Sequence, residues 1–282
     1  MSKIAPLSSR ALLRLEGADV VGFLQNLITN DVENLTDGQA SFAALLTPQG
    51  KVLFDFIVLR EGNGFTIDID RQQRDSMAKL LTFYKLRADV QISNDERGVI
   101  AGWPDLAAMP SAGFADPRHD GLGWRLFDNG PETNSDANSD ESAWHENRIA
   151  VGIPQSGEDF ELGEVFPHDI LLDQLHTGGI DFSKGCYVGQ EVVSRMQHRG
   201  TARNRFVIAK ASNPLPADAR GATLTADGKR VGTLGSFAGK TGLALVRVDR
   251  IGSALEAGTA IMAGDMEVTL EIPSFANFGW GK

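Results

Sequence analysis

The C-terminal part of the chain constrains the fold most, because after Arg203 the sequence breaks into short apolar runs separated by turn residues. The turns include Asp227-Gly228 and Gly264-Asp265. Short, evenly spaced strands with glycine turns are typical of a small antiparallel barrel. We therefore expect a β-barrel domain over residues 201–282, with strands at 205–210, 222–224, 231–236, 242–248, 259–262 and 266–272.

The first 200 residues mix strand and helix patterns, which predicts an α+β fold. At 282 residues the chain is longer than most single domains, so we expect two interleaved α+β domains here, the second over roughly 45–105. Alternation predicts strands at 11–16, 41–46, 51–60, 65–70, 90–93, 99–103 and 124–127. Helical spacing predicts helices at 20–28, from Met77 to Tyr84, at 144–152, around 170–175 and at 190–199.

A polar segment, residues 128–142, contains Ala137 as its only hydrophobic residue, so it predicts a mobile loop. Trp144 stands at the end of this segment. A tryptophan is costly to expose, and the two interpretations are a core residue or a stacking wall for a flat ligand. A core position is the default interpretation of Trp144, and because a loop lies next to it, a ligand-stacking role remains an alternative.

Cys186 is the only cysteine, and it lies in the dense run KGCYVGQE at 184–191. A lone cysteine is commonly a small buried hydrophobe. A reactive thiol requires a cation or a helix N-terminus to lower its pKa, and Lys184 and the helix expected at 190–199 offer both. Gly185 and Gly189 would let the backbone turn tightly around the thiol. One thiolate cannot hold zinc or an iron–sulfur cluster alone, so we expect no dedicated metal site.

A cationic stretch follows the cysteine: Arg195, Arg199, Arg203, Arg205 and Lys210. It predicts either capture of carboxylates or phosphates, or a solvated helix face. Arg195, one helical turn after Glu191, is the best candidate for function. A net charge of −10 argues against general nucleic-acid binding. The N-terminus lacks a secretory signal and no apolar run could span a bilayer, so we expect a cytoplasmic protein without a membrane segment.

Asp55 stands inside the apolar strand 52–59, where its carboxylate faces either solvent or a ligand. Its alternation with Phe54 and Phe56 favours solvent. The sequence contains no phosphate-binding glycine loop, dinucleotide fingerprint or serine-nucleophile elbow. Nucleotide hydrolysis, hydride transfer and serine hydrolysis therefore lack support.

The segment 182–200, FSKGCYVGQEVVSRMQHRG, resembles the signature of the YgfZ family of folate-binding iron–sulfur assembly factors. The blocks FLQNLITNDV at 23–32 and TPQGKV at 47–52 are similar to the family's N-terminal blocks. The block 144–154, which ends in Gly152-Ile153-Pro154, resembles the one ahead of the signature. The cysteine block is the specific one, and together the blocks cover most of the first 200 residues.

This resemblance implies the three-domain fold of the glycine-cleavage T protein, a tetrahydrofolate-dependent aminomethyltransferase, with two interleaved domains around a central channel and a terminal barrel. Folate would lie in that channel. Trp144 matches the family position placed against folate, and Arg195 matches a neighbouring position of the signature, so we expect Trp144, Arg195 and Asp55 to bind folate. T proteins carry two adjacent acids where this chain has Phe54-Asp55, and the missing acid argues against aminomethyl transfer.

The resemblance implies a tetrahydrofolate-binding accessory protein that supports assembly or repair of iron–sulfur clusters in client enzymes, including tRNA-modifying ones. Cys186 would act as a transient ligand or in thiol exchange, sharing the cluster with a client, glutathione or a second subunit. The loop would be shaped by Lys184, Gly185, Tyr187 and Gly189, and the following turn held by Gln190 and Glu191. The alternatives are a folate-dependent methyl or aminomethyl transferase, a folate-binding scaffold without thiol chemistry, and local RNA contact through 195–210.

Overall fold

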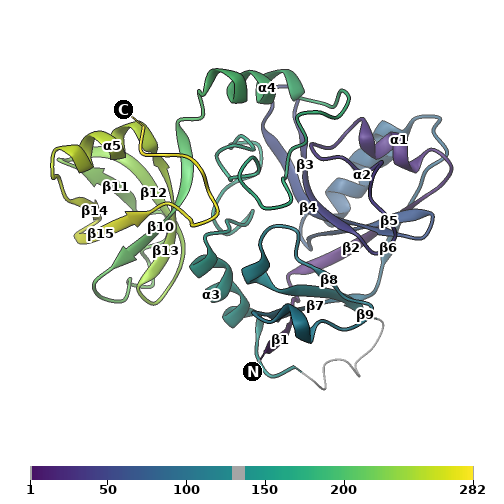
Figure 1. Ribbon diagram of the computed structural model, residues 1–282, viewed down its shortest axis with the longest axis horizontal. Coiled ribbons are helices and arrows are strands. Elements are labelled where there is room, and N and C mark those ends of the chain that lie inside the picture. The colour runs from purple at the N-terminus through teal and green to yellow at the C-terminus, as the bar shows by residue number, and fades with distance from the viewer. Residues whose placement is uncertain (1, 129–136, 282) are drawn as a thin grey trace.

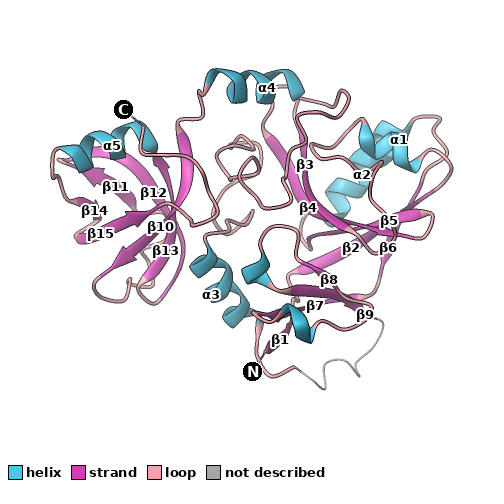
Figure 2. Ribbon diagram, viewed as in Figure 1, coloured by secondary structure: helices cyan, strands magenta, loops and turns pink. Residues whose placement is uncertain are grey.

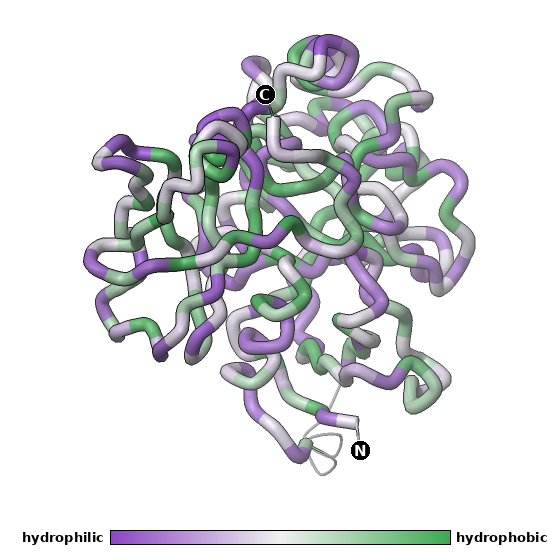
Figure 3. Tube along the Cα trace, turned by 60° about the vertical axis from the view of Figure 1, so that its left-hand side comes forward, coloured by the Kyte–Doolittle hydropathy of each residue, from purple (hydrophilic) through white to green (hydrophobic). Residues whose placement is uncertain are grey.

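The computed structural model describes residues 2–128 and 137–281, and its elements form three lobes around an irregular segment, residues 152–189. Figure 1 shows the C-terminal barrel on one side, a five-stranded sheet on the other and a four-stranded sheet below. Hydrophobic stretches of the chain lie mostly in the interior, and many outer loops are hydrophilic (Figure 3). The expected α+β fold with a terminal barrel is confirmed.

The five-stranded sheet has the order β3-β4-β5-β2-β6. Its strands are β2 (Arg10–Glu16), β3 (Ala40–Leu46), β4 (Val52–Glu61), β5 (Gly64–Asp70) and β6 (Gln91–Asp95), and its helices are α1 (Val20–Gln25) and α2 (Arg74–Lys85). Along β4, Phe56 and Val58 pack in the core beneath these helices, whereas Ile57 and Leu59 pack in the core on the opposite face. Both faces of β4 are therefore buried.

The four-stranded sheet has the order β1-β7-β9-β8. It consists of β1 (Lys3–Pro6), β7 (Gly98–Trp103), β8 (Phe114–Ala115) and β9 (Trp124–Asp128), with two 3-10 turns, η1 (Leu106–Ala108) and η2 (Asp120–Leu122). The short β1 and β8 were not predicted from the sequence. Most of the polar segment expected as a loop, residues 129–136, lies outside the described residues.

Helix α3 (Glu141–Val151) begins at the end of the polar segment, three residues before the predicted start. The Asp140 side chain accepts a hydrogen bond from the Ala143 amide at 2.9 Å and so caps its first turn. Gly152 ends the helix with a left-handed φ of 97°. These caps fix Trp144 within the first turns of α3.

The C-terminal barrel is closed, in the order β10-β13-β12-β11-β14-β15. Its elements are β10 (Asn204–Ala211), β11 (Thr223–Ala226), β12 (Lys229–Ala238), β13 (Thr241–Arg247), α5 (Val248–Glu256), β14 (Ile261–Ala263) and β15 (Met266–Glu271). All six strands match the predicted runs. Helix α5 was missed, although Val248 and Ile251 are buried at helical spacing.

The irregular segment connects the lobes (Figure 2). Val52 of β4 exchanges backbone hydrogen bonds with it, donating to the Val165 carbonyl at 2.9 Å and accepting from the Gly163 amide at 2.7 Å. The helix predicted around 170–175 is wrong: this stretch forms consecutive turns, because Leu171 adopts a left-handed φ of 66° that interrupts a helical repeat. Helix α4 (Gln190–Arg199) then follows where the sequence predicted it.

Candidate functional site

Cys186 is a free, exposed thiol in the loop that precedes α4. It lies three residues before the N-cap of that helix, Gly189, and the next residue, Tyr187, is buried in the core. The buried interpretation of the cysteine is therefore wrong, because Tyr187 rather than Cys186 takes the inward position of the loop. The thiol is accessible to a partner molecule.

Lys184 is directed into the protein body. Its ammonium donates hydrogen bonds to the carbonyl oxygens of Ile28 and Asn30, both at 2.8 Å, and lies 5.4 Å from the centre of the Tyr187 ring. Burial lowers the pKa of Lys184 to about 8, opposed by the negative charges of Asp31 and Asp181. Lys184 thus anchors the cysteine loop to the segment that follows α1.

Two glycines bring the cysteine loop against the turn after β3. Gly189 has a left-handed φ of 81°, and a Cβ atom there would lie 2.6 Å from the Thr47 carbonyl oxygen. Gly50, with φ of 78°, would place a Cβ atom 2.9 Å from the Cβ of Val192. Gly185 has free space around it and no left-handed φ. Close packing therefore requires glycine at position 189, whereas the structure shows no packing reason for glycine at position 185.

Helix α4 presents Arg195 to solvent, with 55% of its side chain exposed and an ion pair to Glu191 one turn earlier. Arg199 and Arg203 are also exposed. Arg205 is buried and pairs with Asp173 at 2.5 Å, and Lys210 pairs with Glu271 at 2.6 Å. Of the predicted cationic stretch, Arg195, Arg199 and Arg203 therefore remain exposed to an external anion.

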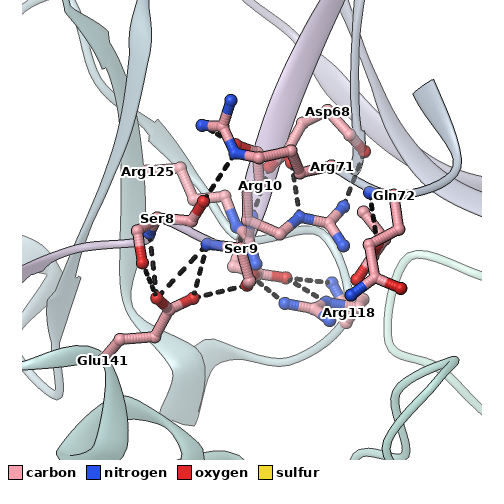
Figure 4. Close-up of polar contacts among 11 residues, drawn as sticks. Ser8, Ser9, Arg10, Asp68, Arg71, Gln72, Arg118, Arg125 and Glu141 are labelled. Atoms are coloured by element: carbon pink, nitrogen blue, oxygen red, sulfur yellow. Dashed lines mark hydrogen bonds and ion pairs between the residues drawn. The ribbon is translucent and has the colours of Figure 1, made fainter. Parts of the chain in front are cut away.

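A buried ion-pair cluster joins the two sheets near the centre of the molecule, and Figure 4 shows its contacts. Asp68 of β5 binds Arg10 of β2 at 2.6 Å and also pairs with Arg125 of β9. Asp116 binds Arg125 at 2.9 Å and Arg118 at 2.7 Å. We call these five residues the central cluster. Each of its three guanidinium groups pairs with one or both of its two carboxylates, and the cluster carries one positive charge in excess.

Asp55 borders the central cluster, and the expectation that it faces solvent is wrong. Its side chain shares the parity of Ile57 on β4, and that face is covered by protein, so only 7% of Asp55 is exposed. Burial raises the pKa of Asp55, against the opposing effects of the Ser156 hydroxyl and of the charges of Arg10 and Arg118. Its Oδ1 atom has no hydrogen-bond partner among the described residues.

Trp144 is 1% exposed, as the core interpretation predicted. The guanidinium groups of Arg118 and Arg125 lie over its indole, 5.6 and 5.3 Å from the ring centre. Its Nε1–H finds no acceptor within the described part of the chain. A buried donor without a partner is costly, so this atom and Asp55 Oδ1 mark places where a polar ligand or water would be stabilised.

A cavity of about 490 Å³ lies beside the central cluster and shares Asp116 with it. Its walls come from the segment after α1, the start of β3, the β8 region and the irregular segment, including Asn30, Asp31, Phe114 and Thr177. This volume is within the range of small-molecule sites. None of the candidate residues Asp55, Trp144, Cys186 and Arg195 lines it. A larger cavity of about 650 Å³ lies on the barrel between β12 and α5, and no candidate residue lines it.

Sequence reasoning missed the central cluster. Its members come from strands and loops far apart in the sequence, and only the Asp116–Arg118 pair, two residues apart, gave a local signal. Within the described ranges, no group of three acidic, histidine or cysteine side chains is arranged to hold a metal ion. No helix between residues 2–128 or 137–281 has the length and apolar character to cross a bilayer.

Comparison with known proteins matches residues 203–278 to the C-terminal β-barrel domain of the CAF17 family. The mitochondrial iron–sulfur cluster assembly factor IBA57 of Homo sapiens is 30% identical over 279 residues, covering 87% of this chain and 77% of that protein. IBA57 of Mus musculus is also 30% identical, covering 90% and 80%. The glycine cleavage system aminomethyltransferase T of Bartonella henselae has the same fold, with a TM-score of 0.76 at 17% identity over 100% of this chain and 88% of that one.

Proposed function

The chain belongs to the IBA57/YgfZ family of iron–sulfur cluster assembly factors, and from this premise we propose that it is a tetrahydrofolate-binding accessory protein that supports cluster assembly or repair in client enzymes. These clients include enzymes that modify tRNA. The two IBA57 proteins named above are mitochondrial. For this chain we propose a cytoplasmic location, which cell fractionation would check.

The exposed Cys186 is the observation that carries the proposal. Iron–sulfur clusters are held by cysteine thiolates, and a ligand that passes a cluster on must be reachable from outside. The neighbours of Cys186 are held in place, Lys184 by two carbonyl groups and Tyr187 in the core, so the thiol is presented on an anchored loop. Since the chain has one cysteine, the remaining ligands come from a client, glutathione or a second copy.

The residues around the central cluster fit a flat, polar ligand such as the pterin of tetrahydrofolate. Asp55 Oδ1 would accept a hydrogen bond from a ring N–H, and Trp144 Nε1–H would donate one. The adjacent cavity, whose lining includes neither Asp55 nor Trp144, has a volume in the range of small-molecule sites, and Phe114 supplies an aromatic wall there. When bound, tetrahydrofolate supplies a one-carbon carrier. Arg195, which lies on the exposed face of α4, receives no folate contact in this proposal.

The test of the folate site is a calorimetric titration of the purified chain with tetrahydrofolate. Asp55→Asn keeps the shape of the side chain but replaces one acceptor oxygen with an NH2 donor and removes the charge, so we expect the Kd to rise about tenfold, which corresponds to about 1.4 kcal/mol. The matched control, Asp227→Asn on the barrel, should leave the Kd unchanged. Equal affinities of Asp55→Asn and the wild type would contradict the site, and turnover of a one-carbon donor would favour a transferase instead.

A further inference from the structure

Two segments far apart in the sequence, 28–31 and 178–184, are joined by hydrogen bonds. The Thr29 hydroxyl donates to the Gly179 carbonyl at 2.6 Å, and the Asn30 side-chain amide donates to the Gly178 carbonyl at 2.9 Å. The Asp181 amide donates to the Thr29 carbonyl at 3.0 Å. Because these bonds are spaced along both segments, a displacement of one segment moves the other.

Lys184 completes this contact at the end nearest the thiol. Its ammonium binds the carbonyls of Ile28 and Asn30, and its backbone amide donates to Asp181 Oδ1 at 3.0 Å. Cys186 follows two residues later, in the exposed part of the loop. The ammonium of Lys184 is thus the last anchor between the 28–31 segment and the thiol.

The 28–31 segment and the residues directly before the 178–184 segment both line the 490 Å³ cavity. Asn30 and Asp31 come from the 28–31 segment, and His176 and Thr177 lie directly before the bonded stretch. The Asn30 amide has two N–H groups but three acceptors within reach: the Ser41 hydroxyl, the Phe42 carbonyl and the Gly178 carbonyl. Its hydrogen bonds can therefore redistribute when a ligand enters the cavity.

We propose that Lys184 is a positioning residue that ties Cys186 to the wall of the cavity, so that folate binding and the accessibility of the thiol are coupled. The inference rests on the proposed function, because it takes tetrahydrofolate as the occupant of the cavity. A ligand that orders the 28–31 segment orders the loop held by Lys184, and this changes how readily Cys186 meets a partner. Coupling is reciprocal, so a group bound at Cys186 changes the affinity for folate.

The test is the rate at which iodoacetamide alkylates the purified chain, with and without saturating tetrahydrofolate. Cys186 is the only cysteine, so the rate reports this site alone. We expect folate to change the rate of the wild type about fivefold or more, within the usual range of coupling between sites. Lys184→Met should remove the folate effect while folate still binds, and Lys184→Arg should restore part of it. The control Lys79→Met, on the exposed face of α2, should behave as the wild type.

Three outcomes would overturn the proposal, and they differ from one another. If folate binds but leaves the alkylation rate of the wild type unchanged, the coupling is wrong and the folate site stands. If Lys184→Met keeps the full folate effect, the role of Lys184 is wrong. If tetrahydrofolate does not bind at all, both the proposed function and the coupling fail. Should Lys184→Met not fold, the wild type alkylated at Cys186 must show a several-fold change in folate Kd, and an unchanged Kd would refute the coupling.

Discussion

Gly189→Ala tests how the cysteine loop is held. The left-handed φ of 81° costs an alanine about 1–2 kcal/mol. In addition, the new Cβ would lie 2.6 Å from the Thr47 carbonyl oxygen, whereas ordinary contacts begin at 3.4 Å. Relieving such an overlap typically costs about 1–3 kcal/mol, since backbone must move. We therefore expect the free energy of unfolding to fall by about 2–5 kcal/mol.

The assay is urea denaturation, and the chain offers a matched control in the same loop. Gly185→Ala meets no atom within 4 Å and no left-handed φ, so we expect a change within about 0.5 kcal/mol. Gly50→Ala should also destabilise, and the double variant should cost less than the sum, because both changes disrupt one contact. Equal effects of Gly189→Ala and Gly185→Ala would refute the packing argument.

Two further changes probe the buried charges. Arg125→Met leaves the carboxylates of Asp68 and Asp116 short of a partner in the core, so we expect a loss of about 3–5 kcal/mol in urea denaturation; a loss below about 1 kcal/mol would contradict the role of the cluster. Burial raises the pKa of Asp169 to about 6 from 3.8, so the folded state holds this proton more tightly than the unfolded state does. The stabilisation that the folded state gains from protonation of Asp169 is complete below pH 3.8 and is lost as the pH rises through about 6. Lowering the pH from 7 to 4 should therefore stabilise the wild type relative to Asp169→Asn by up to about 3 kcal/mol. A pH-independent difference between the two in urea denaturation would contradict that pKa.

The strands were predictable from the sequence because their signals are local. The barrel runs after Arg203 alternate and end at turn residues, and the structure follows them closely. Helix α5 was missed because Val248 continues the apolar run of β13, and the helical spacing begins only there. The prediction of a helix around 170–175 was wrong because Leu171 adopts a left-handed backbone conformation, which cannot be predicted from a leucine in the sequence.

The site was predictable only where one short segment carries it. The KGCYVGQE run pointed to an accessible thiol, and the helix after it lies where its polar pattern placed it. Asp55 could not be placed by alternation, because alternation cannot tell whether the second face of a sheet is covered by protein. The central cluster depends on Arg10, Asp68 and Arg125 meeting across two sheets, which local patterns do not encode.

The most direct test of the central claim uses a deletion strain complemented with the wild type or with Cys186→Ala. Because Cys186 is exposed, the variant should fold, accumulate and bind tetrahydrofolate as the wild type does. The measurement is the activity of iron–sulfur enzymes together with the methylthio modification of tRNA. We predict that Cys186→Ala fails to restore either readout. Full restoration by a variant without the thiol would contradict a role for Cys186 in cluster assembly.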